Sequence, residues 1–282
     1  MKEKFENPRP FPILFDIELT NYCNMNCKFC PVGQEWMMRP QGFMSREVFE
    51  KIIKEIVKER SPDQQVGIRF IRWGEPLLHP FLLEFTEYAE RQDIICHINT
   101  NATLIDSEFI SRIVKIPLTS IKFSMQEVTA HGYEYWRGKN FFAELLGWVK
   151  ELYYRRSHRQ FPFIQIGTTV SKNTYDELQI KRFKDYVSQY CDLVTVGRTR
   201  NLINDEVVTN YPECPEMFDK LSIDWDGDVT ACCADWNKWM VVGNVKEQSL
   251  KEIWEGEKLK SYREMLIKKQ HNLLPVCKKC IL

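Results

Sequence analysis

The sequence alternates between short runs of β-forming apolar residues and longer segments with an apolar residue at every third or fourth position. Apolar residues from Val48 to Val57 have this helical spacing and follow Ser45, a typical helix N-cap residue. Such an alternation predicts a parallel sheet with right-handed helical crossovers. The predicted strands are 13–19, 66–71, 94–98, 120–124, 163–170 and 193–196, and the other predicted helices are 81–88, 142–153 and 178–190. Six such units predict an α/β protein with a partial (β/α)6 TIM-like barrel.

The alternation stops at a polar segment, 201–213, which predicts a domain boundary. Beyond it, runs 221–225 and 229–232 flank Asp226-Gly227-Asp228, and an Asp-Gly turn supplies the positive φ angles of a β-hairpin. An apolar stripe over 250–266 predicts one C-terminal helix. We therefore expect an N-terminal extension (1–12), the barrel (13–205) and a small C-terminal domain (206–282).

Charge and hydropathy exclude several classes of partner. The 39 basic and 39 acidic residues cancel and form no long block of one sign, so we expect neither nucleic acid nor an anionic membrane as a partner. No stretch approaches the ~20 apolar residues that cross a bilayer. The first twelve residues lack a signal-peptide hydrophobic region. These features predict a cytoplasmic protein.

Ten cysteines indicate metal or redox chemistry, because cytosolic thiols stay reduced. Cys23, Cys27 and Cys30 form a C-x3-C-x2-C triplet directly after the first predicted strand, at the end where barrel enzymes place their chemistry. A [4Fe–4S] cluster normally takes four cysteine ligands. Three ligands would leave one iron open to another molecule. The alternative is a zinc site, although zinc sites usually have four ligands in paired spacing.

The triplet, with Phe29 before its last cysteine, resembles the signature of the radical S-adenosylmethionine (radical SAM) superfamily. Gly74-Glu75-Pro76, after the second strand, resembles the superfamily's Gly-Gly-Glu-Pro motif, with Trp73 in place of the first glycine. Thr100-Asn101-Ala102 resembles its Thr-Asn-Gly turn, with alanine in place of glycine. The resemblance implies that the protein contacts S-adenosylmethionine through Phe29, Gly74, Glu75, Pro76, Asn99, Asn101, Ser124, Gln126 and Val170, with Asn173 nearby.

A second group of cysteines lies in the last quarter. Cys214, Gly227 and Cys232 fit the C-x9-15-G-x4-C pattern of the SPASM and twitch extensions of this superfamily, and Cys277-x2-Cys280 completes four ligands. Four thiolates saturate one iron–sulfur cluster. A full SPASM domain carries further cysteines for a second auxiliary cluster, and none follow Cys280 here, so the shorter twitch form resembles this domain best. The resemblance implies a second [4Fe–4S] cluster, with [2Fe–2S] or structural zinc as alternatives. Cys96, Cys191 and Cys233 are expected not to ligate, Cys233 because neighbouring strand residues point to opposite faces.

The resemblance implies that the open cluster cleaves S-adenosylmethionine reductively and that the product radical abstracts hydrogen from a small-molecule substrate. A saturated second cluster suits an electron acceptor, which favours oxidation of a secondary alcohol. A flavodoxin or ferredoxin is the expected electron donor. Alternatives are an epimerase or C–C bond-forming enzyme acting on a sugar-like metabolite, with a cysteine returning hydrogen, and a ribosomal peptide maturase. The short segment before Cys23 favours a free small substrate. A structural interaction module is the non-enzymatic alternative.

Charged residues at predicted strand ends are candidates for substrate contact. Glu127 is a candidate proton acceptor, and Arg198 and Arg200 are candidates for binding a carboxylate or phosphate. Tyr133, Tyr135, Trp136 and Arg137 are predicted to lie in a loop that resembles the superfamily's Arg-Gly turn at Arg137-Gly138.

Overall fold

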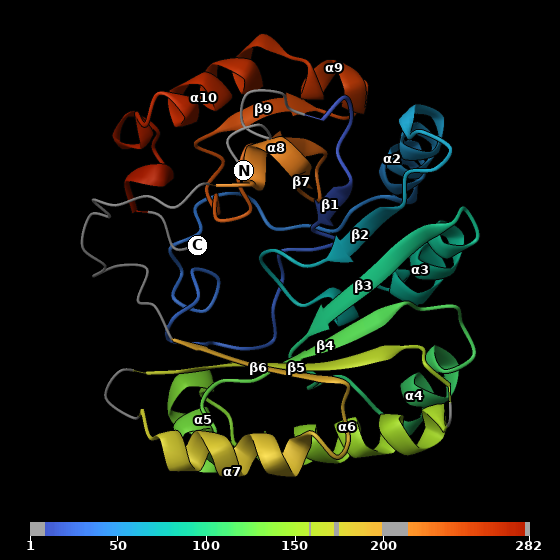
Figure 1. Ribbon diagram of the computed structural model, residues 1–282, viewed down its shortest axis with the longest axis vertical. Coiled ribbons are helices and arrows are strands. Elements are labelled where there is room, and N and C mark those ends of the chain that lie inside the picture. Colours follow the sequence, from blue (N-terminus) through green and yellow to red (C-terminus); the bar gives the residue numbers. More distant parts are fainter. Residues whose placement is uncertain (1–8, 158, 172–174, 199–213, 280–282) are drawn as a thin grey trace.

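The computed structural model describes residues 9–157, 159–171, 175–198 and 214–279. In these residues nine strands form one sheet in the order β6-β5-β4-β3-β2-β1-β7-β8-β9 (Figure 1). The strands are β1 (Leu14–Ile17), β2 (Val66–Phe70), β3 (Ile94–Thr100), β4 (Ser120–Ser124), β5 (Phe163–Val170), β6 (Leu193–Arg198), β7 (Lys220–Ile223), β8 (Asp228–Thr230) and β9 (Val241–Asn244). The first six pair in parallel, as the alternating sequence predicts.

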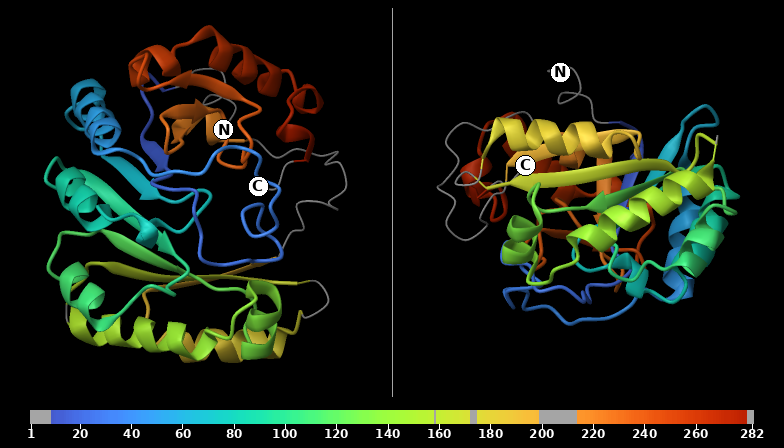
Figure 2. Two further views of the ribbon diagram at one scale, coloured as in Figure 1. Left: turned by 180° about the vertical axis from the view of Figure 1, so that it is seen from behind. Right: turned by 90° about the horizontal axis from the view of Figure 1, so that it is seen from below.

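The helices cover the convex face of this curved sheet (Figure 1). They are α2 (Arg46–Glu59), α3 (Leu82–Glu90), α4 (Ser107–Ile113), α5 (Ala130–Arg137), α6 (Phe142–Arg156), α7 (Glu177–Val187), α8 (Glu216–Asp219), α9 (Leu250–Trp254) and α10 (Glu257–Ile267), with 3-10 turns η1 (Pro76–Leu78), η2 (His271–Leu273) and η3 (Cys277–Lys279). The segment between β1 and α2 occupies the open, concave side, as the reverse view in Figure 2 also shows. The predicted α/β fold is confirmed.

Apolar side chains of the strands pack against the apolar stripe of each helix. In α2 the predicted N-cap is confirmed, because the Ser45 side chain accepts from the Val48 amide. Phe49 of this helix is fully buried, stacks on Phe85 of α3 with ring centroids 4.2 Å apart and meets Phe70 of β2. This aromatic group joins two crossover helices to the sheet.

The C-terminal hairpin continues the sheet of the barrel. Strand β7 pairs in parallel with β1 over its whole length, and β8 and β9 follow as antiparallel neighbours. Both edges of β1 are therefore used, by β2 and by β7. The predicted domain boundary near residue 205 lies outside the described residues and stays a prediction.

Several local predictions were wrong. Tyr133 to Arg137 lie in helix α5, not in a loop; the Thr129 side chain caps its start and Gly138, at φ 74°, ends it. The single C-terminal helix is two helices separated at Gly256. Strand β8 ends at Thr230, because the Thr230 hydroxyl bonds to the Cys232 carbonyl and the chain turns there. Helix α4 and strand β9 were not predicted.

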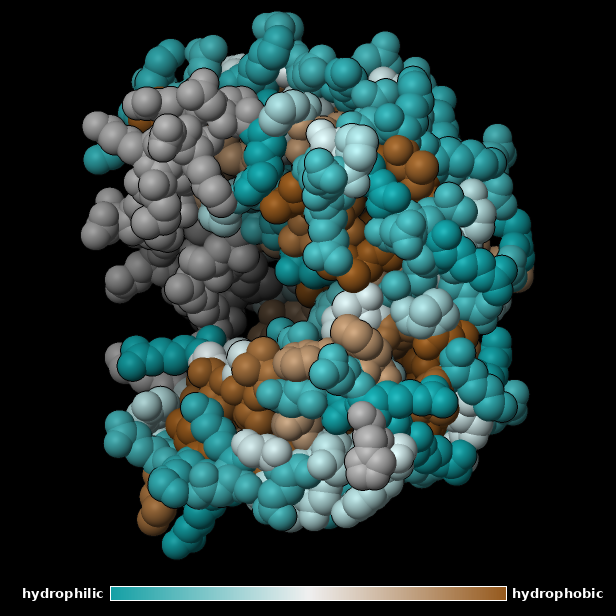
Figure 3. All heavy atoms as spheres, turned by 45° about the vertical axis from the view of Figure 1, so that its right-hand side comes forward, coloured by the Kyte–Doolittle hydropathy of each residue, from teal (hydrophilic) through white to brown (hydrophobic). Residues whose placement is uncertain are grey.

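The outer surface is mostly hydrophilic. Figure 3 shows hydrophilic side chains over most of one face, with hydrophobic ones gathered toward its middle. None of the described helices combines the length and the apolar character that crossing a bilayer would require.

Replacing Phe49 tests the aromatic group that joins α2 to the sheet. We expect Phe49→Ala to lower the free energy of unfolding by about 3–5 kcal/mol, because a fully buried ring leaves a cavity. Urea unfolding followed by circular dichroism measures the change. Val57→Ala, at a position of the same helix that is 36% exposed, is the matched control and should change the value by about 0.5 kcal/mol or less. Equal effects of the two substitutions would contradict this account of the core.

Candidate functional site

The three N-terminal cysteines meet in one cavity. Cys23, Cys27 and Cys30 follow β1 and line a cavity of about 400 Å³ at the carboxyl ends of the strands. The loop is tight: a side chain on Gly33 would place its Cβ 2.5 Å from the Cys27 amide nitrogen. Two polar side chains lie close to the cysteine sulfurs. Arg137 Nη1 is 3.6 Å from Cys27 Sγ, and Asn101 Nδ2 is 3.9 Å from Cys23 Sγ.

The buried thiols are poor acids without a metal. Burial is the main reason that the pKa of Cys23 rises to about 12, and the pKa of Cys30 also rises for that reason. A coordinating metal deprotonates a thiol outright. The triplet therefore suits a resident cation whose charge compensates three thiolates, as an iron–sulfur cluster provides.

The turn after β2 brings a carboxyl group to the same cavity. Gly74 has φ 123°, and a Cβ there would lie 2.2 Å from the Thr20 carbonyl oxygen, so only glycine allows this approach. The Glu75 amide donates to the Tyr22 carbonyl at 2.8 Å. Its carboxyl oxygens accept from Thr100 Oγ1 and the Asn101 amide, each at 2.7 Å. The turn and the cysteine loop are thus held together.

Glu75 has no ion-pair partner among the described residues, and the charge of Arg137 acts on it more weakly than burial does. The side chain is fully buried, and burial raises its pKa to about 7 despite three hydrogen-bond donors. Such a carboxyl group suits a ligand ammonium, which would favour its ionised form. The residues present therefore fit the methionine amino group of S-adenosylmethionine.

Strands β3 to β6 complete the wall with polar groups. Asn99, Ser124, Thr169 and Arg198 line the cavity from the ends of four successive strands. Buried polar atoms usually have partners. In the described residues, Asn99 Oδ1, Trp73 Nε1 and Arg137 Nε are buried without one, although all three residues line the cavity. A polar ligand would satisfy them.

The structure brings together most, but not all, of the residues predicted to contact the cofactor or, for Glu127 and Arg198, the substrate. The cavity includes Phe29, Gly74, Glu75, Asn99, Asn101, Ser124 and Arg198. Four predicted residues are not in its wall. Pro76 begins turn η1, and Val170 is buried in the hydrophobic core. Gln126 Oε1 accepts a hydrogen bond from Thr169 Oγ1, and Glu127 Oε1 accepts one from the Ser171 amide. Their roles stay predictions. Arg200 and Asn173 lie outside the described residues.

Sequence reasoning missed several residues of the wall, namely Met25, Arg72, Trp73, Thr100, Arg137 and Thr169. For Arg137 a signal was present. Thr129 and Gly138 are a helix N-cap residue and a terminating glycine, and together they predict a short helix that carries Arg137 in its last turn. The helix explains how Arg137 reaches a cysteine sulfur.

Two of the C-terminal cysteines, Cys232 and Cys233, lie in the loop after β8, and Cys277 begins turn η3. Cys232 and Cys277 are buried and Cys214 is half-buried, whereas Cys280 lies outside the described residues. The prediction that Cys233 points away from Cys232 was wrong, because both follow the end of β8 in a turn. Their sulfurs and a Glu216 carboxylate oxygen lie within 4.8 Å of one another. Ligation by Cys214, Cys232, Cys277 and Cys280 stays a prediction.

Comparison with known families decides the class. Residues 17–179, more than half of the chain, match the family model described as the radical SAM superfamily. The chain belongs to the radical SAM superfamily. Residues 214–281 of this radical SAM protein match SPASM, described as an iron–sulfur cluster-binding domain. The protein is therefore an enzyme that uses a [4Fe–4S] cluster and S-adenosylmethionine, with further iron–sulfur binding at its C-terminal end.

Relatives of this radical SAM enzyme cover nearly its whole length. The tungsten-containing aldehyde ferredoxin oxidoreductase cofactor-modifying protein of Pyrococcus furiosus is 23% identical over 94% of this chain and 86% of its own length. The S-adenosyl-L-methionine-dependent 2-deoxy-scyllo-inosamine dehydrogenase of Niallia circulans is 24% identical over 95% and 92%. The crystal structure of BtrN in complex with AdoMet and 2-DOIA superposes with a TM-score of 0.62 at 19% identity, covering 98% of this chain and 95% of that one. The superposition confirms the fold.

The charge of Glu75 should control cofactor binding. We expect Glu75→Gln to weaken S-adenosylmethionine binding roughly 10- to 100-fold, as loss of a charged hydrogen bond does. Because the raised pKa is about 7, wild-type affinity should rise with pH through 7 and then level off, whereas the variant should show no such rise. Anaerobic equilibrium dialysis measures both.

Glu90→Gln is the matched control for that substitution. Its carboxyl oxygen accepts from the Cys96 and Thr119 amides, and it does not line the cavity. Binding to this variant should match the wild type. A Glu75→Gln variant with wild-type affinity and pH dependence would remove Glu75 from the cofactor site.

Iron counting tests both ligand sets. After anaerobic reconstitution we expect about eight irons per chain, and about four when Cys23, Cys27 and Cys30 are all replaced by alanine. Replacing Cys232 should also leave about four. Cys96→Ala is the control and should keep about eight, because that thiol is buried against the Thr86 carbonyl of α3. Zinc in place of iron would rule out both cluster assignments.

Proposed function

We propose that this radical SAM enzyme oxidises a secondary alcohol of a free small molecule to a ketone, with the auxiliary cluster as electron acceptor. The proposal depends mainly on the contact between the two sites: the loop that carries Cys232 packs directly against the cofactor turn through Arg72 and Trp73. Near full-length similarity to a 2-deoxy-scyllo-inosamine dehydrogenase supports the same reaction type. The substrate class is inferred from that likeness.

The chain supplies the ligands and the cavity, and the bound cofactors supply the radical. When bound, the reduced cluster and S-adenosylmethionine provide a 5′-deoxyadenosyl radical that abstracts a hydrogen atom. Cys23, Cys27 and Cys30 hold that cluster, and Glu75 holds the cofactor ammonium. Thr169 and Arg198 line the β5 and β6 side of the cavity, where a polar substrate would lie. Electrons come from a small donor protein such as flavodoxin or ferredoxin.

Lys122 is the proposed proton acceptor, in place of Glu127. It is in register with Asn99 of β3, so both side chains share the face that lines the cavity. Its side chain lies over Gly167, where an added Cβ would be 2.1 Å from Lys122 Cε. Within the described part of the chain, its amino group has no hydrogen-bond or ion-pair partner. Burial, and then the charge of Arg69, lower its pKa, so the amine loses its proton more easily than that of an exposed lysine.

The step balances with these groups. With both clusters and the cofactor bound, the carbinol carbon would lose a hydrogen atom to the deoxyadenosyl radical, its hydroxyl proton would pass to Lys122, and the auxiliary cluster would take up the remaining electron. The carbon–oxygen bond becomes a ketone.

The epimerase alternative requires a thiol near the substrate. Cys96 and Cys191 are unsuitable, because their sulfurs face the Thr86 carbonyl of α3 and the Val187 carbonyl of α7 on the helix side of the sheet. Cys233 is half-buried, 3.9 Å from Lys220 Nζ, and is the remaining candidate of the three. A product with unchanged oxidation state would favour this alternative.

The test uses 2-deoxy-scyllo-inosamine deuterated at the carbinol carbons, with S-adenosylmethionine and reductant. We expect deuterium in 5′-deoxyadenosine and one ketone per deoxyadenosine, measured by mass spectrometry. Lys122→Met should cleave S-adenosylmethionine but form ketone about 100-fold more slowly. Lys122→Arg keeps a long basic side chain that stays protonated, so it cannot accept the proton and should also form ketone slowly. Reductive cofactor cleavage with the alcohol left intact would contradict oxidation of this substrate class.

A further inference from the structure

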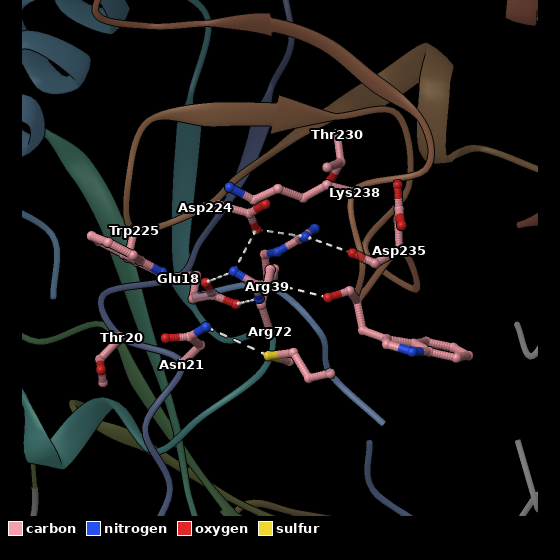
Figure 4. Close-up of polar contacts among 12 residues, drawn as sticks. Glu18, Thr20, Asn21, Arg39, Arg72, Asp224, Trp225, Thr230, Asp235 and Lys238 are labelled. Carbon is pink, nitrogen blue, oxygen red and sulfur yellow. Dashed lines mark hydrogen bonds and ion pairs between the residues drawn. The ribbon is translucent and has the colours of Figure 1, made fainter. Parts of the chain in front are cut away.

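The two residues before Gly74 lie between the cofactor cavity and the loop of the auxiliary domain. Arg72 follows β2 at φ 104°, and Trp73 stands where the superfamily motif has glycine. Both line the cofactor cavity. Figure 4 shows the Arg72 side chain directed toward Asp224, at the end of β7, and toward Asp235 in the loop after Cys232.

A single guanidinium group contacts the auxiliary loop at several points. Arg72 Nη1 lies 3.4 Å from the Cys232 carbonyl oxygen, and Nη2 lies 3.2 Å from the Asp235 carbonyl oxygen and 2.7 Å from Asp224 Oδ1. The Trp73 ring meets Trp236 edge to face, with centroids 5.8 Å apart. The loop from Cys232 to Trp236 is thus attached to the cofactor turn by both residues.

These charges are completely withdrawn from solvent. The side chains of Arg72 and Asp224 are each 0% exposed. A second buried pair, Arg39 with Glu18, lies beside them, and Arg39 Nε donates to the Trp236 carbonyl at 2.8 Å. In such surroundings, water screens a charge poorly. Each of these charges therefore acts strongly on neighbouring groups.

We propose that Arg72 is a positioning residue of the auxiliary cluster, which holds the Cys232–Trp236 loop and raises the reduction potential of that cluster. The inference rests on the proposed role of Cys232 as a ligand. Hydrogen bonds, net charge and burial are the levers by which a protein sets the potential of an iron–sulfur cluster. Arg72 combines a positive charge, complete burial and a bond to the carbonyl of a ligand residue.

The two charges of the ion pair should shift the reduction potential of the auxiliary cluster in opposite directions, and this provides a test. A buried positive charge favours the reduced cluster and a buried negative charge opposes it. Arg72→Met should therefore lower the potential and Asp224→Asn should raise it, although both break the same ion pair. A purely structural role would move both variants in one direction. Arg72→Lys keeps the charge but has a single ammonium group for three acceptors. Its reduction potential should therefore lie between those of Arg72→Met and the parent.

The experiment uses the full chain with Cys23, Cys27 and Cys30 replaced by alanine, so that only the auxiliary cluster contributes to the spectrum. Its midpoint potential is measured by redox titration with electron paramagnetic resonance at pH 8, above the pKa of about 7 to which burial raises Asp224. Arg39→Met is the matched control. It removes the other buried arginine, whose contact is with the Trp236 carbonyl, and should give a smaller shift.

Each outcome decides the proposal. Opposite shifts in Arg72→Met and Asp224→Asn, with a smaller shift in Arg39→Met, support it. Shifts of equal sign, no shift, or an equal effect of Arg39→Met overturn it. If the parent protein binds no iron, the proposed cluster ligation fails, and amide hydrogen exchange of the apo protein decides about Arg72. Faster exchange at residues 233–236 in the uncharged double variant Arg72→Met/Asp224→Leu supports positioning, and unchanged exchange overturns it.

Discussion

Strand β1 is paired in parallel on both edges, and the rest of the site depends on this arrangement. Its last residue, Ile17, is opposite Phe70 of β2 and Ile223 of β7. Three strands therefore end at one level, and the chain leaves them side by side. The cysteine loop, the Gly74-Glu75 turn and the hairpin that leads to Cys232 follow these three strands. They lie close together because the hydrogen-bonded strands end side by side.

Buried charges then determine how the three loops pack against one another. Glu18 follows β1, Arg72 follows β2 and Asp224 follows β7, while Arg39 returns from the far part of the cysteine loop. Buried ion pairs contribute little net stability, because desolvation offsets their attraction. They do penalise alternatives, since any loop arrangement that separates the partners leaves an uncompensated charge. We interpret this network as a device that specifies one relative placement of the two cysteine sets.

The sequence predicts the parts of this protein that follow from local periodicity. All six parallel strands, the N-cap at Ser45 and the cysteine triplet after β1 lie where predicted. The pairing of β7 with β1 was not predictable in this way, because it joins Leu14 to Lys220 across most of the chain and has no local signal. The roles of Arg72 and Trp73 were missed for a related reason. Their partners, Cys232 to Trp236, are distant in sequence, so the motif showed only that Trp73 replaces its first glycine.

The two cysteine sets differ in how the surrounding polar groups are used, and this difference matches their proposed roles. At the N-terminal set, Asn99 and Trp73 line the cavity, and Asn99 Oδ1 and Trp73 Nε1 are buried without a partner in the described part of the chain, which is costly unless a ligand satisfies them. At the C-terminal set, several acceptors of the loop after Cys232 have partners: the Cys232 and Asp235 carbonyls bond to Arg72, and the Asp235 carboxylate bonds to the Trp239 and Met240 amides. Among the described residues of this set, Glu216 Oε2 is buried without a partner. A site that binds a ligand keeps hydrogen-bond donors and acceptors free for that ligand. A site that only accepts an electron should instead have a rigid loop whose polar groups already have partners. The first arrangement suits cofactor binding and the second suits electron acceptance.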